Sequence, residues 1–294
     1  MYALLVALLG SLAVAHAAPV APLAAPTKHW FIFGDSYSWT GFDHTLAQPS
    51  AANPLGNPGL PGHTICGNIP AYVYYTATTY NNSLTLAYNL AKAGATVDAK
   101  VVAGATNVTL VVQVDEFAKT YAGSSRPAPW TADNSLFSLW FGVNDIGGSY
   151  KWDVNQTALH DKILDSYFRN VQRLVDLGAR NFLIINAPPT DRSPQLLEDT
   201  KPNQEKYRAG VKDLNAKLAT RVSSFKASHS QVSLRMLDVH TLLTNILDAP
   251  QLYGFVDSTT YNETRSDVVW CGKYHVSPGV HNYISRGVQL ALDS

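Results

Sequence analysis

The sequence predicts an α/β fold: a three-layer α/β/α sandwich with a central parallel sheet. Four short runs are almost wholly apolar and most stop at a turn residue, a pattern typical of strands buried on both faces. Segments with apolar residues at helical spacing separate or follow these runs, and such alternation favours parallel strands covered by helices. The 294 residues, 46% of them hydrophobic, are enough for one sizeable core.

The four predicted strands are residues 30–33, 136–141, 182–185 and 232–237. Gly34, Gly142 and Asn186 directly follow the first three, so each of these strands ends in a turn. Catalytic residues of open α/β sheets lie beyond the carboxyl ends of the strands. The residues after these three turns are therefore the first place to look for a site.

The predicted helices are amphipathic. Apolar residues recur at helical spacing from residue 163 to 175, and Gly178 then supplies a helix stop. The polar stretch 195–229 carries a second, longer helical pattern. Val280, Ile284 and Val288 recur every four residues, which predicts a last helix packed on the core. Residues 48–67 are dense in Pro, Gly and Asn and too long for an ordinary connection, so they are candidates for shaping a binding surface.

The first residues indicate export. Residues 1–17 form an apolar run that ends in Ala-His-Ala, which predicts a signal peptide cleaved after Ala17 and a secreted, extracellular protein. Residues 18–28 read as a Pro/Ala-rich linker, and residues 29–294 as one domain. The Asn-x-Ser/Thr pattern of glycosylation acceptors, which agrees with export, occurs at Asn81, Asn107, Asn155 and Asn262.

The charge balance excludes two classes of partner. Lys plus Arg and Asp plus Glu both number 22, which removes the broad positive field needed for nucleic acid or anionic membranes. The leader is too short for a comfortable membrane span, so no stable membrane insertion is expected. No pattern implies a metal or another cofactor. We expect a small-molecule or oligosaccharide substrate with little charge; the oligomeric state is left open.

Four blocks carry residue types suited to nucleophilic catalysis. Ser36 follows the first strand in Gly-Asp-Ser, where a helix would begin and backbone N–H groups lack partners. Asn144 follows the second strand in Gly-x-Asn-Asp and can donate to a developing oxyanion. Gly94 allows close backbone approach, and His275, before the last helix, is the best-placed base. Each block alone also fits a cap, a turn or a structural histidine, so only their combination predicts a serine hydrolase.

The order of these blocks resembles the SGNH or GDSL hydrolase superfamily, whose fold is flavodoxin-like. The stretches FGDSYSWTGF, NPLGNPGLPG and YNLAKAGATVD are similar to fungal secreted acetyl esterases of carbohydrate esterase family sixteen. The resemblance implies that Ser36 is the nucleophile and His275 its base. It also implies an oxyanion hole made by the main-chain N–H groups of Ser36 and Gly94 and the side-chain amide of Asn144.

The sequence departs from the family pattern at one position. An aspartate is usual three residues before the catalytic histidine, and here that residue is Gly272. Such a carboxylate fixes the imidazole tautomer and stabilises the imidazolium. Asp267, Asp257 or a backbone carbonyl remains as the acceptor for the imidazole N–H. We therefore predict a Ser36–His275 dyad with no assigned aspartate.

The two cysteines, Cys66 and Cys271, complete the prediction for this loop. Export favours their pairing over two free thiols. A bridge would tie the histidine loop to the segment that precedes Gly94.

Together these features predict a secreted serine esterase. The resemblance to the carbohydrate esterases implies that it hydrolyses short-chain, most simply acetyl, esters on plant cell-wall carbohydrates or oligosaccharides. Aromatic residues near the blocks are candidate stacking faces for a sugar ring: Trp30, Tyr37, Trp39 and Trp270. Two alternatives stay open. One is a lipase or phospholipase of the same fold, for which an exposed apolar lid is expected. The other is a secreted carbohydrate-binding protein whose site has decayed at Gly272.

Overall fold

The computed structural model describes residues 27–293. The predicted signal peptide, residues 1–17, and most of the predicted linker, residues 18–28, lie outside the described residues. The first strand begins at Lys28, one residue before the predicted start of the domain.

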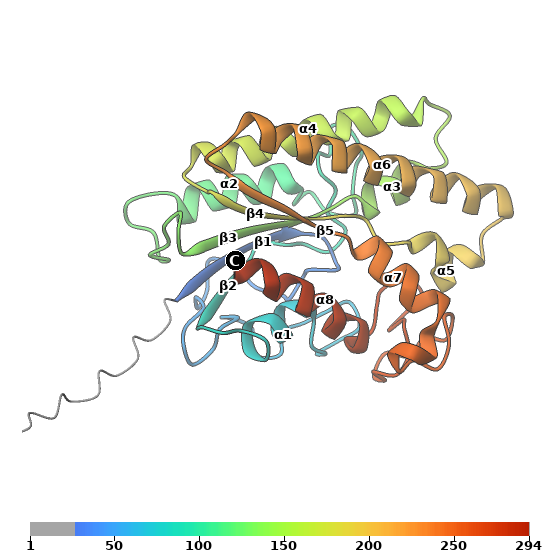
Figure 1. Cartoon of the computed structure of the whole chain (residues 1–294), viewed down its shortest axis with the longest axis horizontal. Helices are drawn as coiled ribbons and strands as arrows, with labels where there is room; N and C mark the ends of the chain where they lie inside the picture. Colours follow the sequence, from blue (N-terminus) through green and yellow to red (C-terminus); the bar gives the residue numbers. More distant parts are fainter. Residues whose placement is uncertain (1–26, 294) are drawn as a thin grey trace, which may run out of the picture.

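Within this range a five-stranded parallel sheet forms the centre of the molecule (Figure 1). Its strands are β1 Lys28–Gly34, β2 Thr85–Asn89, β3 Ser135–Trp140, β4 Asn181–Ile185 and β5 Ser233–Leu237. Their order across the sheet is β2-β1-β3-β4-β5, which is the flavodoxin-like order. The predicted fold class is confirmed.

Helices cover both faces of this sheet (Figure 1). One face carries α1 Tyr72–Thr78, α7 Val239–Asp248 and α8 Pro278–Leu292, and the other carries α2 Leu110–Tyr121, α4 Gln156–Asp176 and α6 Lys201–Ser228. The short helices α3 Val143–Ser149 and α5 Pro194–Leu197 follow β3 and β4, and two 3₁₀ turns are η1 Thr190–Arg192 and η2 Pro250–Tyr253.

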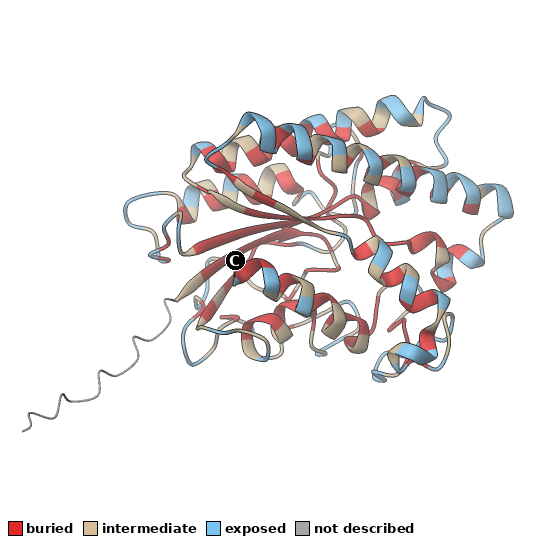
Figure 2. Cartoon of the chain, in the orientation of Figure 1, coloured by how far each residue is buried: buried red, intermediate tan, exposed pale blue. Residues whose placement is uncertain are grey.

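Strand β1 shows why the apolar runs are continuous. Successive side chains of a strand point to opposite faces. Trp30 and Ile32 belong to the core between the sheet and α1, α7 and α8, whereas Phe31 and Phe33 belong to the core on the side of α2, α4 and α6. Both faces are buried (Figure 2), so no position on the strand can be polar without cost.

Strand β2 and the stretch 195–229 differ from the sequence-based prediction. Strand β2 was not predicted, because it lies at the edge of the sheet and mixes Thr85 and Asn89 with apolar residues. The stretch 195–229 is not one helical region but α5 and α6, separated by residues 198–200. The Ser193 hydroxyl accepts a hydrogen bond from the Leu196 N–H and so caps α5, while α6 begins afresh with Pro202 in its first turn.

The strand order decides where a site can form. Strand β1 lies between β2 and β3, so the loops after these three strands are neighbours at the carboxyl ends of the strands. Gly94 follows β2, Ser36 follows β1, and Asn144 follows β3. The fold therefore gathers the three sequence blocks with the serine in the middle.

No helix among residues 27–293 is long and apolar enough to cross a membrane.

Candidate active site

Ser36 lies in a tight turn at the end of β1. The side-chain amide of Gln113 bonds both the N–H and the carbonyl of Gly34, each at 2.9 Å, and this holds the strand end. The Tyr37 N–H donates to Asp35 Oδ1 at 3.0 Å, which closes the turn. No helix begins here, contrary to the prediction; the next helix starts at Tyr72. The serine hydroxyl is therefore presented by a turn rather than by a helix end.

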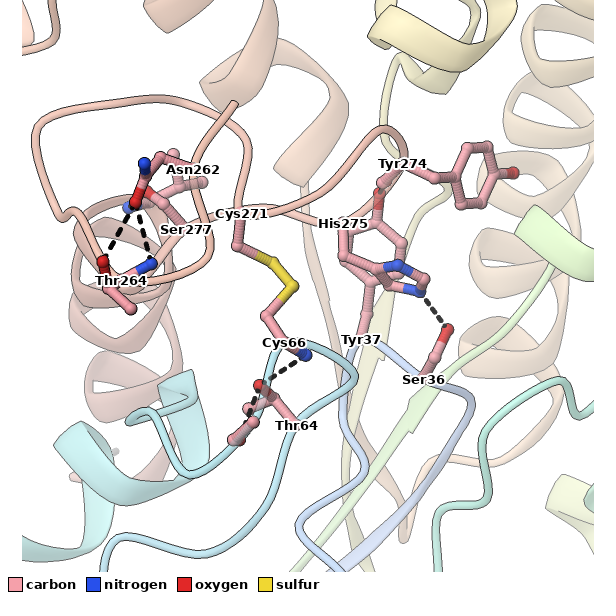
Figure 3. Close-up of a disulfide and its surroundings, with 12 residues drawn as sticks. Ser36, Tyr37, Thr64, Cys66, Asn262, Thr264, Cys271, Tyr274, His275 and Ser277 are labelled. Carbon is pink, nitrogen blue, oxygen red and sulfur yellow. Dashed lines mark hydrogen bonds between the residues drawn. A yellow bond between two sulfur atoms is a disulfide. The ribbon is translucent and has the colours of Figure 1, made fainter. Parts of the chain in front are cut away.

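The loop before α8 brings His275 to this turn. His275 Nε2 lies 2.8 Å from Ser36 Oγ, at hydrogen-bond distance (Figure 3). The Tyr37 hydroxyl donates to the carbonyl of Tyr274 at 2.6 Å, and the ring centres of Tyr37 and His275 are 5.5 Å apart. Tyr37 thus holds the peptide that carries the histidine against the serine turn. The sequence shows that Tyr37 is next to Ser36. It does not show that the Tyr37 hydroxyl bonds Tyr274, which lies 237 residues away.

A disulfide anchors the same loop. Cys66 and Cys271 are bonded (Figure 3), which confirms the predicted pairing. The Cys271 N–H donates to the carbonyl of His275 at 2.9 Å and closes the loop between them. The long segment of residues 48–67 is in this way tied to the histidine.

No carboxylate supports His275 in the described part of the chain. Its Nδ1 has no hydrogen-bond partner among residues 27–293. Asp267 is held by an ion pair with Arg265, and Asp257 accepts hydrogen bonds from Thr259 and Thr260. Neither of the two aspartates considered from the sequence faces the imidazole, and the arrangement is a Ser–His pair.

Burial lowers the pKa of His275 to about 4, because a charged imidazolium is poorly solvated there and no carboxylate offsets the loss. As the expected general base, His275 must be neutral to accept a proton, so we expect activity above its pKa and a loss of activity as the pH falls through it. We expect the acidic limb of kcat/KM for 4-nitrophenyl acetate to centre near pH 4. Burial raises the pKa of Asp35 to about 8 and of Asp145 to about 7, so these carboxyls titrate outside that limb. A limb centred near 6.5 that persists in an Asp145→Asn variant would contradict this environment for His275, because Asp145 itself has a pKa of about 7.

Gly272→Asp is the matched comparison for this measurement. A Cβ at Gly272 meets only Cys66 Sγ at 3.9 Å, an ordinary contact, so the backbone accepts a side chain. A carboxylate three residues before His275 favours the imidazolium, and we expect the acidic limb to move to higher pH. An unchanged limb would show that the carboxylate does not act on His275 from this position.

The N–H groups expected to form an oxyanion hole are unpaired. The main-chain N–H groups of Ser36 and Gly94 have no hydrogen-bond acceptor in the described range. The Asn144 side-chain amide donates one hydrogen to the carbonyl of Ala95 at 2.9 Å, which orients it and leaves its second N–H available. Gly94 has a φ of 77°, and a Cβ there would lie 2.7 Å from the Cβ of Ala105. Only glycine lets the chain take this path without strain.

Two buried aspartates hold the loops that carry these donors. Asp145, next to Asn144, accepts the Val97 N–H with both carboxylate oxygens at 3.1 and 3.3 Å. It links the loop after β3 to the loop that contains Gly94. Asp35 closes the serine turn, and its Oδ2 has no partner within residues 27–293. The motif Gly-x-Asn-Asp therefore contributes one possible donor and one positioning residue, and the sequence showed only the first.

A cavity of about 360 Å³ adjoins the site. Its walls include Asn144, Tyr274, Tyr150, Gln195 and small residues such as Gly104. The expectation of aromatic stacking faces was wrong for three residues, because Trp30, Tyr37 and Trp270 are all buried. Trp39 is half-buried and lines a separate cavity of about 280 Å³. The sequence did not distinguish aromatic residues at the surface from those in the core.

The described residues contain no group of three or more His, Cys, Asp or Glu side chains that could hold a metal ion.

Known proteins resemble this chain over most of its length. A family model described as GDSL-like lipase/acylhydrolase matches residues 31–286. An acetylesterase of Thermothelomyces thermophilus is 38% identical over 285 residues, which cover 96% of this chain and 94% of that protein. A thermolabile hemolysin of Vibrio parahaemolyticus is 29% identical over 77% of this chain and 49% of its own length. Among solved structures, a carbohydrate esterase matches 91% of this chain and 68% of its own at 12% identity, with a TM-score of 0.48.

Proposed function

This chain belongs to the GDSL-like lipase and acylhydrolase family and is a carboxylic ester hydrolase, and we propose that it removes acetyl groups from carbohydrates outside the cell. In this proposal Ser36 is the nucleophile and His275 its general base. The observation that carries it is the 2.8 Å distance between His275 Nε2 and Ser36 Oγ. A neutral imidazole at that distance can take the hydroxyl proton as the oxygen attacks.

The reaction proceeds in two halves. Ser36 Oγ attacks the ester carbonyl while its proton moves to His275 Nε2, and the carbonyl oxygen becomes an oxyanion. The unpaired N–H groups of Ser36 and Gly94 and the second amide hydrogen of Asn144 stabilise this oxyanion. The C–O bond to the alcohol then breaks, and His275 returns the proton to the departing oxygen. Water repeats the sequence on the acyl-enzyme and releases the acid.

The proposed acetyl specificity follows the name of the 38% identical relative, an acetylesterase. The proposed carbohydrate alcohol is supported by the adjoining cavity, whose walls combine the tyrosine rings of Tyr150 and Tyr274 with the amides of Asn144 and Gln195. Aromatic faces and hydrogen-bonding groups in one cavity suit a sugar ring, which has apolar faces and a polar edge. Plant cell-wall polysaccharides or their oligosaccharides are the substrates we propose.

Export is the location we propose. The Ala-His-Ala motif at residues 15–17 and the Cys66–Cys271 disulfide support it, because disulfides persist in oxidising compartments. Among the predicted glycosylation acceptors, three are exposed and Asn81 is half-buried; the exposed ones are Asn107, Asn155 and Asn262.

A lipase is the second candidate, and one observation favours it. Leu46, Leu60 and Ile65 lie in or beside the long segment of residues 48–67 and are exposed. Exposed apolar side chains on the segment that the disulfide ties to the histidine loop would suit a longer acyl chain.

Hydrolysis of 4-nitrophenyl acetate, butyrate and octanoate by the mature protein tests the proposal. We expect kcat/KM to fall steeply from acetate to octanoate. A higher kcat/KM for octanoate than for acetate would contradict the proposed acetylesterase and favour the lipase. If the rates are no higher than those of a Ser36→Ala variant, the result would favour the alternative, a carbohydrate-binding protein whose catalytic site has decayed.

A further inference from the structure

Trp152 differs from the tryptophans of the core. Four of the six tryptophans are buried and donate the indole N–H to an acceptor: Trp30 to Ser138, Trp130 to Tyr121, Trp140 to Asn186 and Trp270 to Ser258. The Trp152 side chain is 43% exposed. Its indole N–H has no acceptor and its ring no aromatic or cationic neighbour among the described residues. Val154 beside it is 51% exposed, so the pair forms an apolar surface without a partner.

This surface borders a second cavity, which shares one wall residue with the cavity beside the active site. The second cavity has a volume of about 410 Å³ and is lined by Trp152, Val154 and His160, among others. Tyr150 lines both this cavity and the 360 Å³ cavity that reaches Asn144. A ligand at Asn144 that is long enough to extend past the Tyr150 ring would reach Trp152.

Tyr150 is held in place between the two cavities. Its hydroxyl donates to Asp199 Oδ2 at 2.8 Å, and the Lys151 ammonium bonds the same oxygen at 2.9 Å. Its ring packs edge-on against Tyr207 with centroids 5.1 Å apart. The backbone of Trp152 is held as well, since its N–H donates to Ser149 and its carbonyl accepts from Gln156. Tyr150 and the backbone of Trp152 are therefore held by hydrogen bonds, while the face of the Trp152 indole ring has no partner among the described residues.

The second cavity also contains polar groups with unused hydrogen-bonding capacity. Asp213 lines it and is partly exposed; its Oδ2 lies 2.7 Å from His160 Nδ1, while its Oδ1 has no partner in the described range. Lys206 lines the same cavity and forms no ion pair within residues 27–293. An aromatic face next to unpaired donors and acceptors is the chemistry that binds a pyranose ring.

We propose that this second cavity is a remote subsite for a sugar residue of the chain whose acetyl group is at Ser36, with Trp152 stacking on its ring. The inference rests on the proposed carbohydrate esterase function and deepens it. Its substrate is an acetylated oligosaccharide or polysaccharide long enough to span both cavities. A single acetylated sugar occupies the first cavity only.

The test compares substrates of different length. The wild type and Trp152→Ala are assayed with 4-nitrophenyl acetate, mono-acetylated xylobiose and mono-acetylated xylohexaose. We expect Trp152→Ala to raise KM for the hexaose roughly three- to tenfold, with KM for the other two substrates unchanged. Trp152→Phe keeps an aromatic face and should retain most of the affinity. Tyr261→Ala removes another exposed aromatic side chain, one that lines none of these cavities, and should change no value.

Other results overturn the subsite. An equal loss on all three substrates would mean that Trp152 acts on the catalytic centre itself. No change on any of them would mean that Trp152 and Val154 pack against something else, such as a glycan on Asn155 or a second copy of the chain. If the wild type hydrolyses none of the three substrates, the proposed esterase function is wrong, whatever the role of Trp152. Calorimetric binding of unacetylated xylohexaose, weaker for Trp152→Ala than for the wild type, then still tests the subsite.

Discussion

Replacing Ser36 with alanine is expected to lower kcat for 4-nitrophenyl acetate by at least about 10⁴-fold. The variant keeps the cavity, the unpaired N–H groups and His275 but lacks the oxygen that is proposed to form the acyl-enzyme. The side chain is small and only partly buried, so the fold should be unaffected. Steady-state kinetics beside a thermal unfolding curve measure both properties on one preparation.

His275→Ala serves as the paired variant. In the proposed mechanism one residue supplies the nucleophile and the other takes its proton, and the two atoms lie 2.8 Å apart. The double variant should therefore lose no more than the more damaged single variant. Losses that multiply would mean that the two side chains act independently. Residual activity within about tenfold of the wild type in Ser36→Ala would place the nucleophile elsewhere.

Asn144→Ala carries the second largest expected effect. It removes one of the three proposed donors to the oxyanion, and loss of such a donor costs about 10²- to 10³-fold in kcat. The oxyanion exists only after attack, so KM should change little. The same amide also bonds the carbonyl of Ala95, and thermal unfolding must show that the Gly94 loop has kept its place.

Two comparisons make the Asn144 result specific. Asn144→Asp keeps the size of the side chain but removes both N–H donors, so it should lose at least as much activity as the alanine variant. Gln195→Ala alters the same cavity away from the oxyanion and should leave kcat for 4-nitrophenyl acetate unchanged. A rise in KM without a fall in kcat for Asn144→Ala would assign the amide to ground-state binding instead.

Much of the fold followed from local pattern. Strands β1, β3 and β4 are apolar at nearly every position because both faces of a parallel sheet are buried, so residues 30–33, 136–141 and 182–185 stand out without any tertiary information. Helix α1 carried no such signal. Its sequence YVYYTAT is rich in β-branched and aromatic residues, and it is helical because its buried face packs against α8.

By itself, the sequence determined the α/β/α class, the positions of Ser36 and Asn144 at strand ends and of His275 in the last loop, the glycine at position 94, and the absence of an aspartate at Gly272. These properties depend on residue type and short spacing. The tertiary structure alone decided which residues support them. The Tyr37 hydroxyl donates to the carbonyl of Tyr274, 237 residues away, and Asp145 accepts a hydrogen bond from the Val97 N–H. Asp267 forms an ion pair with Arg265. It also decided that Trp270 is buried and Trp152 is free, because burial depends on what the rest of the chain packs against a side chain.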